Sequence, residues 1–388
     1  MPAIRLPNRS GKLVTRRLKA QPVTAPPPPH RFNRIAFAAA HVVADPLAAR
    51  ELDAPPALDW DATLAFRRHL LDCGLRVAEA MDTAQRGMGL PWPAARELIQ
   101  RSLDAATAAE RARIFCGVGT DHLQPGSARD IDAITRAYLR QLDAVQSAGG
   151  RVIMMASREL ARIADGPEDY AAVYRRVLAD ADRPVILHWL GEMFDPALAG
   201  YWGRGNLESA ADTVLRIIGD NRAKVDGIKV SLLDAKREIA LRRRLPAGVK
   251  LYTGDDFNYP ALIQGDARGH SHALLGIFDP VAPVASAALT ALAAGDDARY
   301  DELMSPTVDL ARVMFRAPTR HYKTGVVFIA WLNGFQSHFI MPGGAQAMRP
   351  LDYFTQVFLA ADRAGVLRDP ELACARMRRL LSMYGIDA

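Results

Sequence analysis

The stretch GIKVSLLD at residues 227–234 places a lysine, Lys229, inside an apolar run that alternates like a β-strand. Lysine is rarely buried without a partner. This chain also favours arginine, because its Lys and Arg residues total 49 and only seven of them are lysines. In a strand, Lys229 shares one face with Gly227 and Ser231, and the residues between them occupy the other face. If helices cover that second face, Lys229 points into the interior of the fold.

Outside this stretch, short apolar runs alternate with amphipathic helical segments. Two helical segments begin at good N-caps, Asp59 and Ser157. Eight strands with intervening helices is the count of a (β/α)8 TIM barrel, and no Gly-x-Gly-x-x-Gly follows the first strand to favour a doubly wound sheet. We therefore predict an α/β fold with a TIM barrel over residues 33–295. The expected strands lie at 34–41, 75–81, 113–119, 151–156, 184–190, 225–231, 249–254 and 270–278.

The two ends of the chain differ from this pattern. Four helical stretches predict a C-terminal helical extension over residues 296–388. Residues 1–32 form a basic N-terminal arm, in which AIRLP and KLVTRRL flank the turn-like NRSG, so we expect a short β-hairpin followed by a Pro-rich connector. Eight basic residues precede Asp45, the first acidic residue, and account for the net charge of +6. We interpret the arm as solvated and expect no nucleic-acid partner, because the remaining chain has no basic face.

Composition excludes several other classes. No apolar run approaches the roughly 18 residues of a membrane span, and the N-terminus has no apolar signal-peptide core. Cys73, Cys116 and Cys374 are far apart and odd in number. They are typical of core thiols in a reduced, cytoplasmic protein, and they do not predict disulfides or a zinc site.

Polar residues gather where the expected strands end, which is where TIM barrels place their chemistry. The carboxyl ends of seven of the eight strands carry acids, hydroxyls or histidines, and strand six holds the lysine. These residues are His41; Glu79, Asp82 and Thr83; Thr120, Asp121 and His122; Ser157; His188 and Trp189; Lys229 and Ser231; Thr253, Gly254, Asp255 and Asp256; and His270 and His272.

A buried amine has a lowered pKa and can act as a neutral nucleophile that forms an imine with a carbonyl substrate. That chemistry requires that no acid pairs closely with Lys229, and we expect its nitrogen to lie near His188. The structural alternative is a lysine paired with Glu79 or Asp256 that ties the barrel interior together.

The run GIKVS, followed by LYTGDDFNYPALIQGDARGHSHALLGIFDPVAP at 251–283, resembles strands six to eight of the dihydrodipicolinate synthase and N-acetylneuraminate lyase superfamily. Members of that superfamily carry a Gly-x-Lys on strand six and a Ser-Gly-Asp-Asp-like turn after strand seven. Gly227-Ile228-Lys229 and Thr253-Gly254-Asp255-Asp256 match these motifs. The chain resembles a divergent branch of the superfamily over about residues 33–388.

This resemblance implies a class I mechanism, in which Lys229 forms a Schiff base with a 2-oxo acid. His188 falls at the position of the superfamily's strand-five tyrosine, a proton relay, and imidazole can perform acid–base work near neutral pH. The Gly254-Asp255-Asp256 turn is expected to shape the lip of the pocket. No cofactor is implied, and members commonly assemble as homodimers or homotetramers.

One motif departs from the superfamily. The strand-two Gly-Thr-Thr-Gly-Glu run that binds a substrate carboxylate is replaced by AEAMDTAQRGMG at 78–89. Thr83 is the candidate remaining hydroxyl, Asp82 would repel a carboxylate, and Arg86 either binds an anion or lies on the loop. These changes favour a more polar, polyhydroxylated carbonyl compound. The expected substrate-binding residues are Thr83, Asp82, His41, His122, Ser231, Gly254, Asp255, Asp256 and His272.

The sequence therefore predicts a Schiff-base lyase, aldolase or dehydratase that acts on a keto acid or a polyhydroxylated carbonyl compound. One alternative is a divalent-metal-dependent barrel enzyme with ligands among His41, Asp82, Asp121, His122, His188 and His272, although no close ligand spacing supports it. The other is a small-molecule sensor without activity. Metal analysis of the purified protein separates the metal-dependent enzyme from the Schiff-base lyase. Turnover of a substrate separates the sensor from both enzymes.

Overall fold

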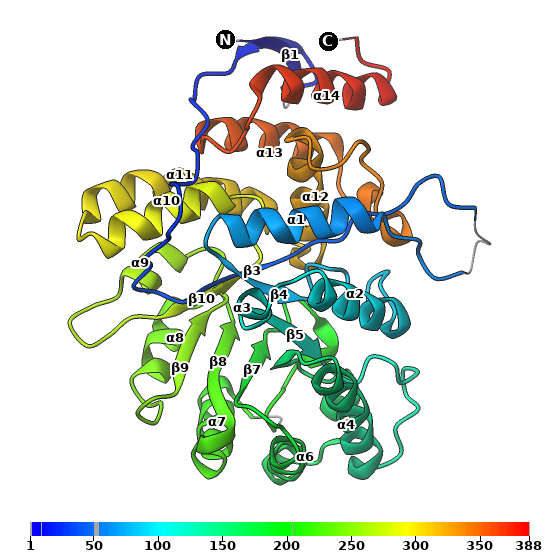
Figure 1. Cartoon of the computed structure of the whole chain (residues 1–388). Coiled ribbons are helices and arrows are strands. Elements are labelled where there is room, and N and C mark those ends of the chain that lie inside the picture. Colours follow the sequence, from blue (N-terminus) through cyan, green and yellow to red (C-terminus); the bar gives the residue numbers. More distant parts are fainter. Residues whose placement is uncertain (1, 9, 50–53, 204, 388) are drawn as a thin grey trace. The chain divides into compact units, whose positions relative to one another are not determined.

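The computed structural model describes residues 2–8, 10–49, 54–203 and 205–387, which form two compact units (Figure 1). The barrel unit comprises Ile35–Ala40 and Arg76–Leu275. The helical unit comprises the residues up to Arg34, His41–Leu75 and the residues from Gly276 onward. This division differs from the consecutive segments expected from the sequence, because the helix after the first barrel strand, α1 (Trp60–Asp72), groups with the C-terminal helices.

Eight parallel strands close the barrel in the order of the sequence, and the last strand pairs with the first. This confirms the predicted (β/α)8 TIM barrel. The strands are β3 (Ala36–Ala39), β4 (Arg76–Glu79), β5 (Ile114–Val118), β6 (Arg151–Met154), β7 (Val185–Leu190), β8 (Val225–Ser231), β9 (Lys250–Thr253) and β10 (His272–Leu275).

Helices follow the strands of the barrel unit, and Figure 1 shows α4, α6 and α7 outside the ring of strands. Ser157 caps α5 by accepting a hydrogen bond from the backbone N–H of Leu160, as predicted, and Asp59 caps α1 in the same way. The helices of this unit are α2 (Trp92–Asp104), α3 (Ala108–Arg111), α4 (Ile131–Ser147), α5 (Arg158–Ile163), α6 (Pro167–Ala179), α7 (Leu207–Asp220), α8 (Ala235–Arg242) and α9 (Tyr259–Gln264), with short 3₁₀ turns at Pro196–Leu198 and Arg222–Lys224.

The strands alternate between an inward and an outward row of side chains. The buried inward cluster contains Phe37, Ala39, Ala78, Met81, Phe115, Ile153, Ile186, Tyr252 and Leu274. Lys229 pairs in register with Tyr252 on one side and with His188 on the other, so it belongs to the inward row. Val230 lines a groove together with residues of α7 and α8, so it belongs to the outward row. The lysine of the GIKVS stretch therefore points into the barrel.

The second unit contains α1, the C-terminal helices and an N-terminal hairpin. The C-terminal helices are α10 (Ala282–Ala293), α11 (Asp297–Met314), α12 (Tyr322–Leu332), α13 (Leu351–Arg363) and α14 (Pro370–Met383), with 3₁₀ turns at Thr319–His321 and Pro342–Ala347. The sequence predicted both the helical extension and the hairpin, which is the antiparallel pair β1 (Ala3–Pro7) and β2 (Leu13–Arg17).

The N-terminal arm is docked within the helical unit, which corrects its interpretation as a solvated arm. Ile4 and Leu6 are buried, and β1 packs on α13 and α14. The carboxylate of Asp362 accepts hydrogen bonds from the backbone N–H groups of Lys19 and Ala20. The alternation of apolar and basic residues in AIRLP gives β1 one buried side. The prediction of a solvated arm relied on the number of basic residues and did not take this alternation into account.

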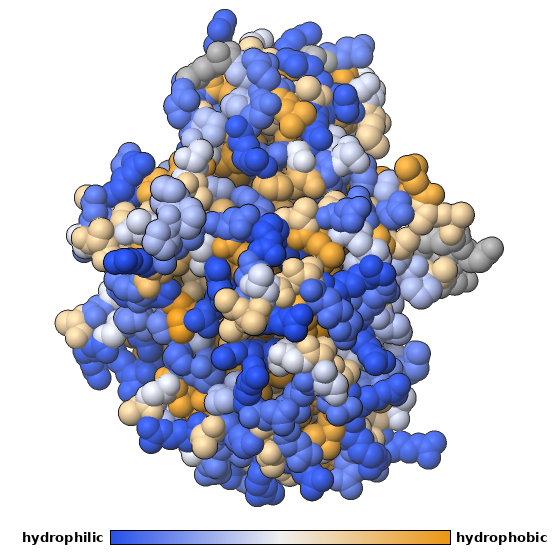
Figure 2. Space-filling model, viewed as in Figure 1, coloured by the Kyte–Doolittle hydropathy of each residue, from blue (hydrophilic) through white to orange (hydrophobic). Residues whose placement is uncertain are grey.

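Polar residues cover most of the face of the molecule shown in Figure 2, and apolar residues are scattered between them. Among the described residues, no helix is both long and apolar enough to cross a membrane.

The buried carboxyl of Glu238 on α8 gives a pH-dependent test of the fold. The hydroxyls of Thr253 and Ser271 donate to its two oxygens at 2.8 and 2.7 Å, and burial raises its pKa from 4.5 to about 8. Between these two values the unfolded chain loses a proton that the folded chain retains, so stability falls as the pH rises. We expect Glu238→Gln to remove this loss, reducing the decrease in unfolding free energy between pH 5 and pH 8 by about 1–3 kcal/mol.

Urea denaturation at several pH values measures this effect. Glu97→Gln is the matched control, because Glu97 is exposed and forms an ordinary surface ion pair with Arg101. Identical pH slopes in the wild type and Glu238→Gln would show that the carboxyl is not protonated in the folded state.

Candidate active site

Lys229 lies in the second half of β8, and its side chain is buried inside the barrel. Its stem passes Gly254, the residue that follows β9. A Cβ atom on Gly254 would lie 2.9 Å from Cε of Lys229 and 2.2 Å from Oγ of Ser231. The absence of a side chain at Gly254 therefore makes room for the lysine.

Burial lowers the pKa of the Lys229 amine from 10.5 to about 8, and the charges of Asp256 and Asp82 limit that shift. A pKa of about 8 leaves roughly a tenth of the amine neutral at pH 7, compared with less than about a thousandth for an ordinary lysine. Burial therefore makes a fraction of the amine neutral, although the charges of the two carboxylates oppose this effect.

His188 is buried beside Lys229 and points inward. Its Nε2 lies 3.2 Å from Oγ of Ser231, which is two residues beyond Lys229 on the same face of β8. Burial, reinforced by the charge of Lys229, lowers the pKa of His188 well below 6.5. The imidazole is therefore neutral near pH 7 and is linked by a hydrogen bond to a hydroxyl.

The turn after β9 separates the roles of two neighbouring acids. The carboxylate of Asp255 accepts from the backbone N–H groups of Phe257 and Asn258 and from the Asn258 side chain at 2.8–3.0 Å, so it holds the turn. Asp256 is buried, and its charge acts on Lys229. Of these two predicted binding residues, Asp256 influences the charge of Lys229, and Asp255 stabilises the backbone of the turn.

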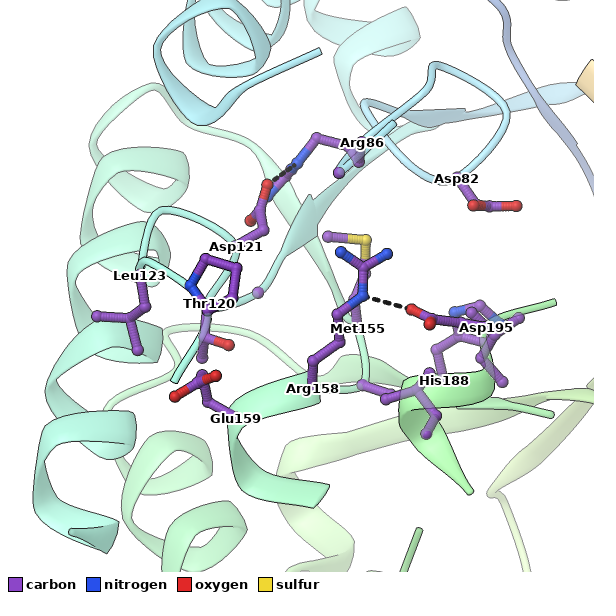
Figure 3. Close-up of a pocket in the computed structure, with 16 residues that line it drawn as sticks. Asp82, Arg86, Thr120, Asp121, Leu123, Met155, Arg158, Glu159, His188 and Asp195 are labelled. Atoms are coloured by element: carbon purple, nitrogen blue, oxygen red, sulfur yellow. Dashed lines mark hydrogen bonds and ion pairs between the residues drawn. The ribbon is translucent and has the colours of Figure 1, made fainter. Parts of the chain in front are cut away.

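A cavity of about 290 Å³ lies at the carboxyl ends of β4 to β7 (Figure 3). Lys229 is not among the described residues that line it, but its neighbour His188 and the acid Asp82 both do. His188 is thus the residue of the cavity wall that pairs in register with Lys229. The other polar lining residues are Arg86, Thr120, Asp121, Arg158, Glu159 and Asp195, and the apolar ones include Leu123, Pro125, Met155, Leu190 and Leu198.

The loops after β4 and β5 meet in an ion pair between Arg86 and Asp121. The side chain of Gln141 on α4 donates to Asp121 and bonds Nδ1 of His122, both at 3.0 Å. Thr83 is buried on the same loop as Arg86. Of the predicted binding residues on these two loops, Asp82 lines the cavity, whereas Thr83 and His122 are not among the described residues that do so.

Two histidines that were predicted to bind substrate, His272 and His41, are not among the described residues that line the cavity. His272 is the first residue of β10, so it lies at the amino end of the strand, where its Nδ1 accepts from the backbone N–H of Ile35. The sequence run HSHALLGIF placed it at the wrong end because the strand begins there. His41 belongs to the helical unit, where its Nδ1 lies 2.8 Å from the buried carboxylate of Asp279 and its ring packs on Phe66.

Sequence reasoning missed the pair Arg158 and Asp195, which lines the cavity and is joined by a 2.6 Å hydrogen bond (Figure 3). Both residues follow strands, in MMASREL and HWLGEMFDP, so their positions alone could have identified them. Both residues also lie at the starts of helical segments, where charged residues are common, so their charge alone did not identify them as site residues. Among the described residues, no three His, Cys, Asp or Glu side chains are grouped as ligands for a metal ion.

The barrel with an inward lysine on its sixth strand has the fold of the dihydrodipicolinate synthase structures. The structure from Thermotoga maritima superimposes with a TM-score of 0.65 at 14% identity, covering 87% of this chain and 100% of that one. A putative synthetase from Pseudomonas aeruginosa gives 0.63 at 17% identity and covers 85% and 99%. YagE, a prophage protein of the dihydrodipicolinic acid synthase family from E. coli K12 in complex with pyruvate, gives 0.62 at 15% and covers 91% and 99%.

The chain belongs to the family described as "Protein of unknown function (DUF993)", whose model matches residues 4–386. No curated protein matches the sequence.

We expect Gly254→Ala to lower the free energy of unfolding by about 1–3 kcal/mol, because the new methyl group must displace Lys229 or Ser231 from a filled interior. Denaturant unfolding provides the measurement. Gly219→Ala on α7 is the matched control, since a Cβ there meets no atom within 4 Å and alanine is favoured over glycine in helices. Equal stability of the two variants would contradict the close approach at Gly254.

Proposed function

We propose that this protein is a Schiff-base-forming lyase, of the aldolase or dehydratase type, that acts on a carbonyl compound. Lys229 is the imine-forming lysine and His188 is the proton relay. The observation that carries the proposal is the buried Lys229 amine, whose pKa falls to about 8 and whose cross-strand neighbour is a neutral imidazole.

The first step forms the imine. The neutral Nζ of Lys229 attacks the carbonyl carbon of the substrate, and the carbonyl oxygen takes up protons and leaves as water, so that a C=N bond replaces the C=O bond. The protonated imine then accepts electrons. In a cleavage, a base removes the hydroxyl proton of the departing fragment, the C–C bond breaks, and its electron pair neutralises the iminium as an enamine. Protonation of the enamine carbon and hydrolysis return the free lysine.

His188 is suited to move the protons in these steps. Its imidazole is neutral, so it can accept a proton without first losing one. Its Nε2 bonds to the hydroxyl of Ser231, which lies on the same inward face as Lys229. We assign Ser231 as a positioning residue that orients the imidazole toward the carbon attached to the lysine.

The similarity of fold supports this assignment, because the pyruvate complex of YagE shows that a barrel of this shape holds a small carbonyl compound. The position of Lys229 on β8, the sixth strand of the barrel, and of the Gly254-Asp255-Asp256 turn after β9, the seventh, supports the roles that the sequence resemblance implies. The cavity beside His188 supplies room for the part of the substrate that is remote from the carbonyl.

Borohydride trapping tests the role of Lys229. Pyruvate, 2-oxobutanoate, dihydroxyacetone and erythrulose serve as carbonyl probes, and hydride reduces any C=N bond to a stable amine that peptide mass mapping locates. We expect an adduct on Lys229 with at least one probe and none in Lys229→Arg, because a guanidinium stays protonated. Lys236→Arg, on the exposed part of α8, is the control and should still be trapped. Adducts only on other lysines would refute the proposal.

The pH dependence and His188→Ala test the proton relay. The trapping rate should rise with pH through about 8, where the Lys229 amine loses its proton, and His188 should add no second limb above neutrality. With a probe that turns over, His188→Ala should lower the rate by about 10²–10⁴-fold and leave the limb near pH 8 in place. His188→Gln, which keeps a hydrogen-bonding group, should be equally slow. Full activity of His188→Gln would reduce His188 to a structural residue.

A further inference from the structure

We propose that the Arg86–Asp121 pair is a specificity-determining element that excludes 2-oxo acids, so that the site takes uncharged, polyhydroxylated carbonyl compounds. This inference rests on the proposed function, since it names the substrate class of the same site. It starts from Arg86, the cation of the loop that follows β4 and a residue that lines the cavity.

All five N–H donors of Arg86 are already used. Nε donates to Asp121 at 2.9 Å, and the Nη1 group donates to the carbonyl oxygens of Ala80 and Gly117 at 3.0 and 3.1 Å. The Nη2 group donates to the second oxygen of Asp121 and, at 3.0 Å, to Oε1 of Gln141. A guanidinium has no sixth donor. A substrate carboxylate could bind Arg86 only by breaking bonds that are already charge-assisted.

The guanidinium is also held in place from other directions. Its face lies over the ring of Trp92, with Cζ 5.2 Å from the ring centre, and the side chain is only 3% exposed. The loop that carries it contains two non-glycine residues in the left-handed region, Ala80 at φ 52° and Gln85 at φ 66°. Such conformations persist only where the surroundings enforce them. Arg86 is therefore a fixed part of the wall and not a mobile arm that waits for an anion.

Asp121 neutralises this cation. Burial alone would raise the pKa of Asp121, but the charge of Arg86 and the hydrogen bonds from Arg86 and Gln141 outweigh burial and hold the pKa below its ordinary value. The carboxylate is thus ionised at neutral pH, and the pair presents no net positive charge to a ligand.

The cavity as a whole has more acidic than basic groups. Among the described residues, four carboxylates, Asp121 included, and two guanidinium groups line it. Nε of Arg158 is paired with Asp195 at 2.6 Å, and Glu159 is paired with Arg162 at 2.8 Å. A carboxylate that entered would meet like charges in a partly desolvated space, which is unfavourable. Hydroxyl groups would find acceptors, because ionised carboxylates only accept hydrogen bonds, and the hydroxyl of Thr120 adds another partner. A volume of about 290 Å³ suits a compound of the size of a simple sugar.

The experiment compares two probe classes at Lys229. Erythrulose and dihydroxyacetone represent uncharged polyhydroxylated ketones, and pyruvate and 2-oxobutanoate represent 2-oxo acids. In the wild type we expect borohydride to trap the neutral ketones on Lys229 at least about tenfold faster than the 2-oxo acids, relative to their rates of reaction with surface lysines. A faster reaction of pyruvate would overturn the inference and leave the proposed function standing.

Binding measured without the imine separates the two ideas further. In Lys229→Ala, erythrulose should raise the melting temperature and pyruvate should not. If this difference appears although no adduct forms in the wild type, the substrate class stands and the Schiff-base chemistry fails. If erythrulose stabilises Lys229→Ala no more than pyruvate does, the inference is refuted.

Asp121→Asn tests the pair directly. It keeps the shape of the side chain but removes the charge that neutralises Arg86, so pyruvate trapping should rise about tenfold, the effect of one charge-assisted hydrogen bond. Asp195→Asn is the matched control, since it removes one carboxylate from the same cavity and leaves Arg86 paired. An equal gain in both variants would show that net charge alone sets specificity and would overturn the role of the pair. If Asp121→Asn does not fold, the comparison of probes in the wild type and in Lys229→Ala still decides the substrate class.

Discussion

The burial of the Lys229 amine inside the barrel is the constraint on which the rest of the proposed site depends. Burial inside the barrel removes the water that would solvate an ammonium group, so it favours the neutral form of Lys229. A carboxylate in contact would offset the desolvation and return the lysine to its ordinary protonated state. The charges of Asp256 and Asp82 favour the ammonium form and burial favours the neutral amine, so the balance of these two effects sets the pKa of Lys229 at about 8.

A second lysine of the same barrel shows the contrast. Lys250 pairs in register with Gly227, two residues before Lys229, toward the amino end of the barrel. Its ammonium lies 2.7 Å from Asp226, whose other oxygen accepts from the hydroxyl of Tyr252 at 2.6 Å. Gly227 allows this packing, because a Cβ there would lie 2.4 Å from the carbonyl oxygen of Lys250. The barrel thus pairs Lys250 with a carboxylate toward its amino end, whereas burial lowers the pKa of Lys229 nearer its carboxyl end.

The sequence predicted the barrel, the inward lysine and the neighbouring His188 because each depends on the local two-residue alternation of a strand. It failed where the result depends on partners distant in the chain. The sequence left open whether Arg86 binds an anion or only lies on the loop. Only the folded structure shows that Asp121 and Gln141 accept hydrogen bonds from its guanidinium group. His272 was assigned to the wrong end because a run of polar and apolar residues does not mark which residue first joins the sheet. The docking of the N-terminal hairpin was not predicted because the buried residues Ile4 and Leu6 flank the charged Arg5 in a segment that is otherwise rich in basic residues.

Several loops at the carboxyl ends of the strands contain non-glycine residues in the strained left-handed region. Of its non-glycine residues with positive φ among those described, Ala80 and Gln85 lie in the loop after β4 that carries Arg86, and Leu233 follows β8. Strain of this kind costs roughly 1–3 kcal/mol for each residue and is retained where a site must be held in one geometry. The loop after β4 uses it to present a neutralised arginine, and the loop after β8 begins directly beyond the lysine and serine of the inward row. The loops after β4 and β8 lie on opposite sides of the ring, because three strands separate β4 from β8 in either direction. In the proposed site, the substrate class is therefore set by the Arg86 loop, away from the strand that carries the lysine, so this loop and its partners can change while Lys229 stays in place.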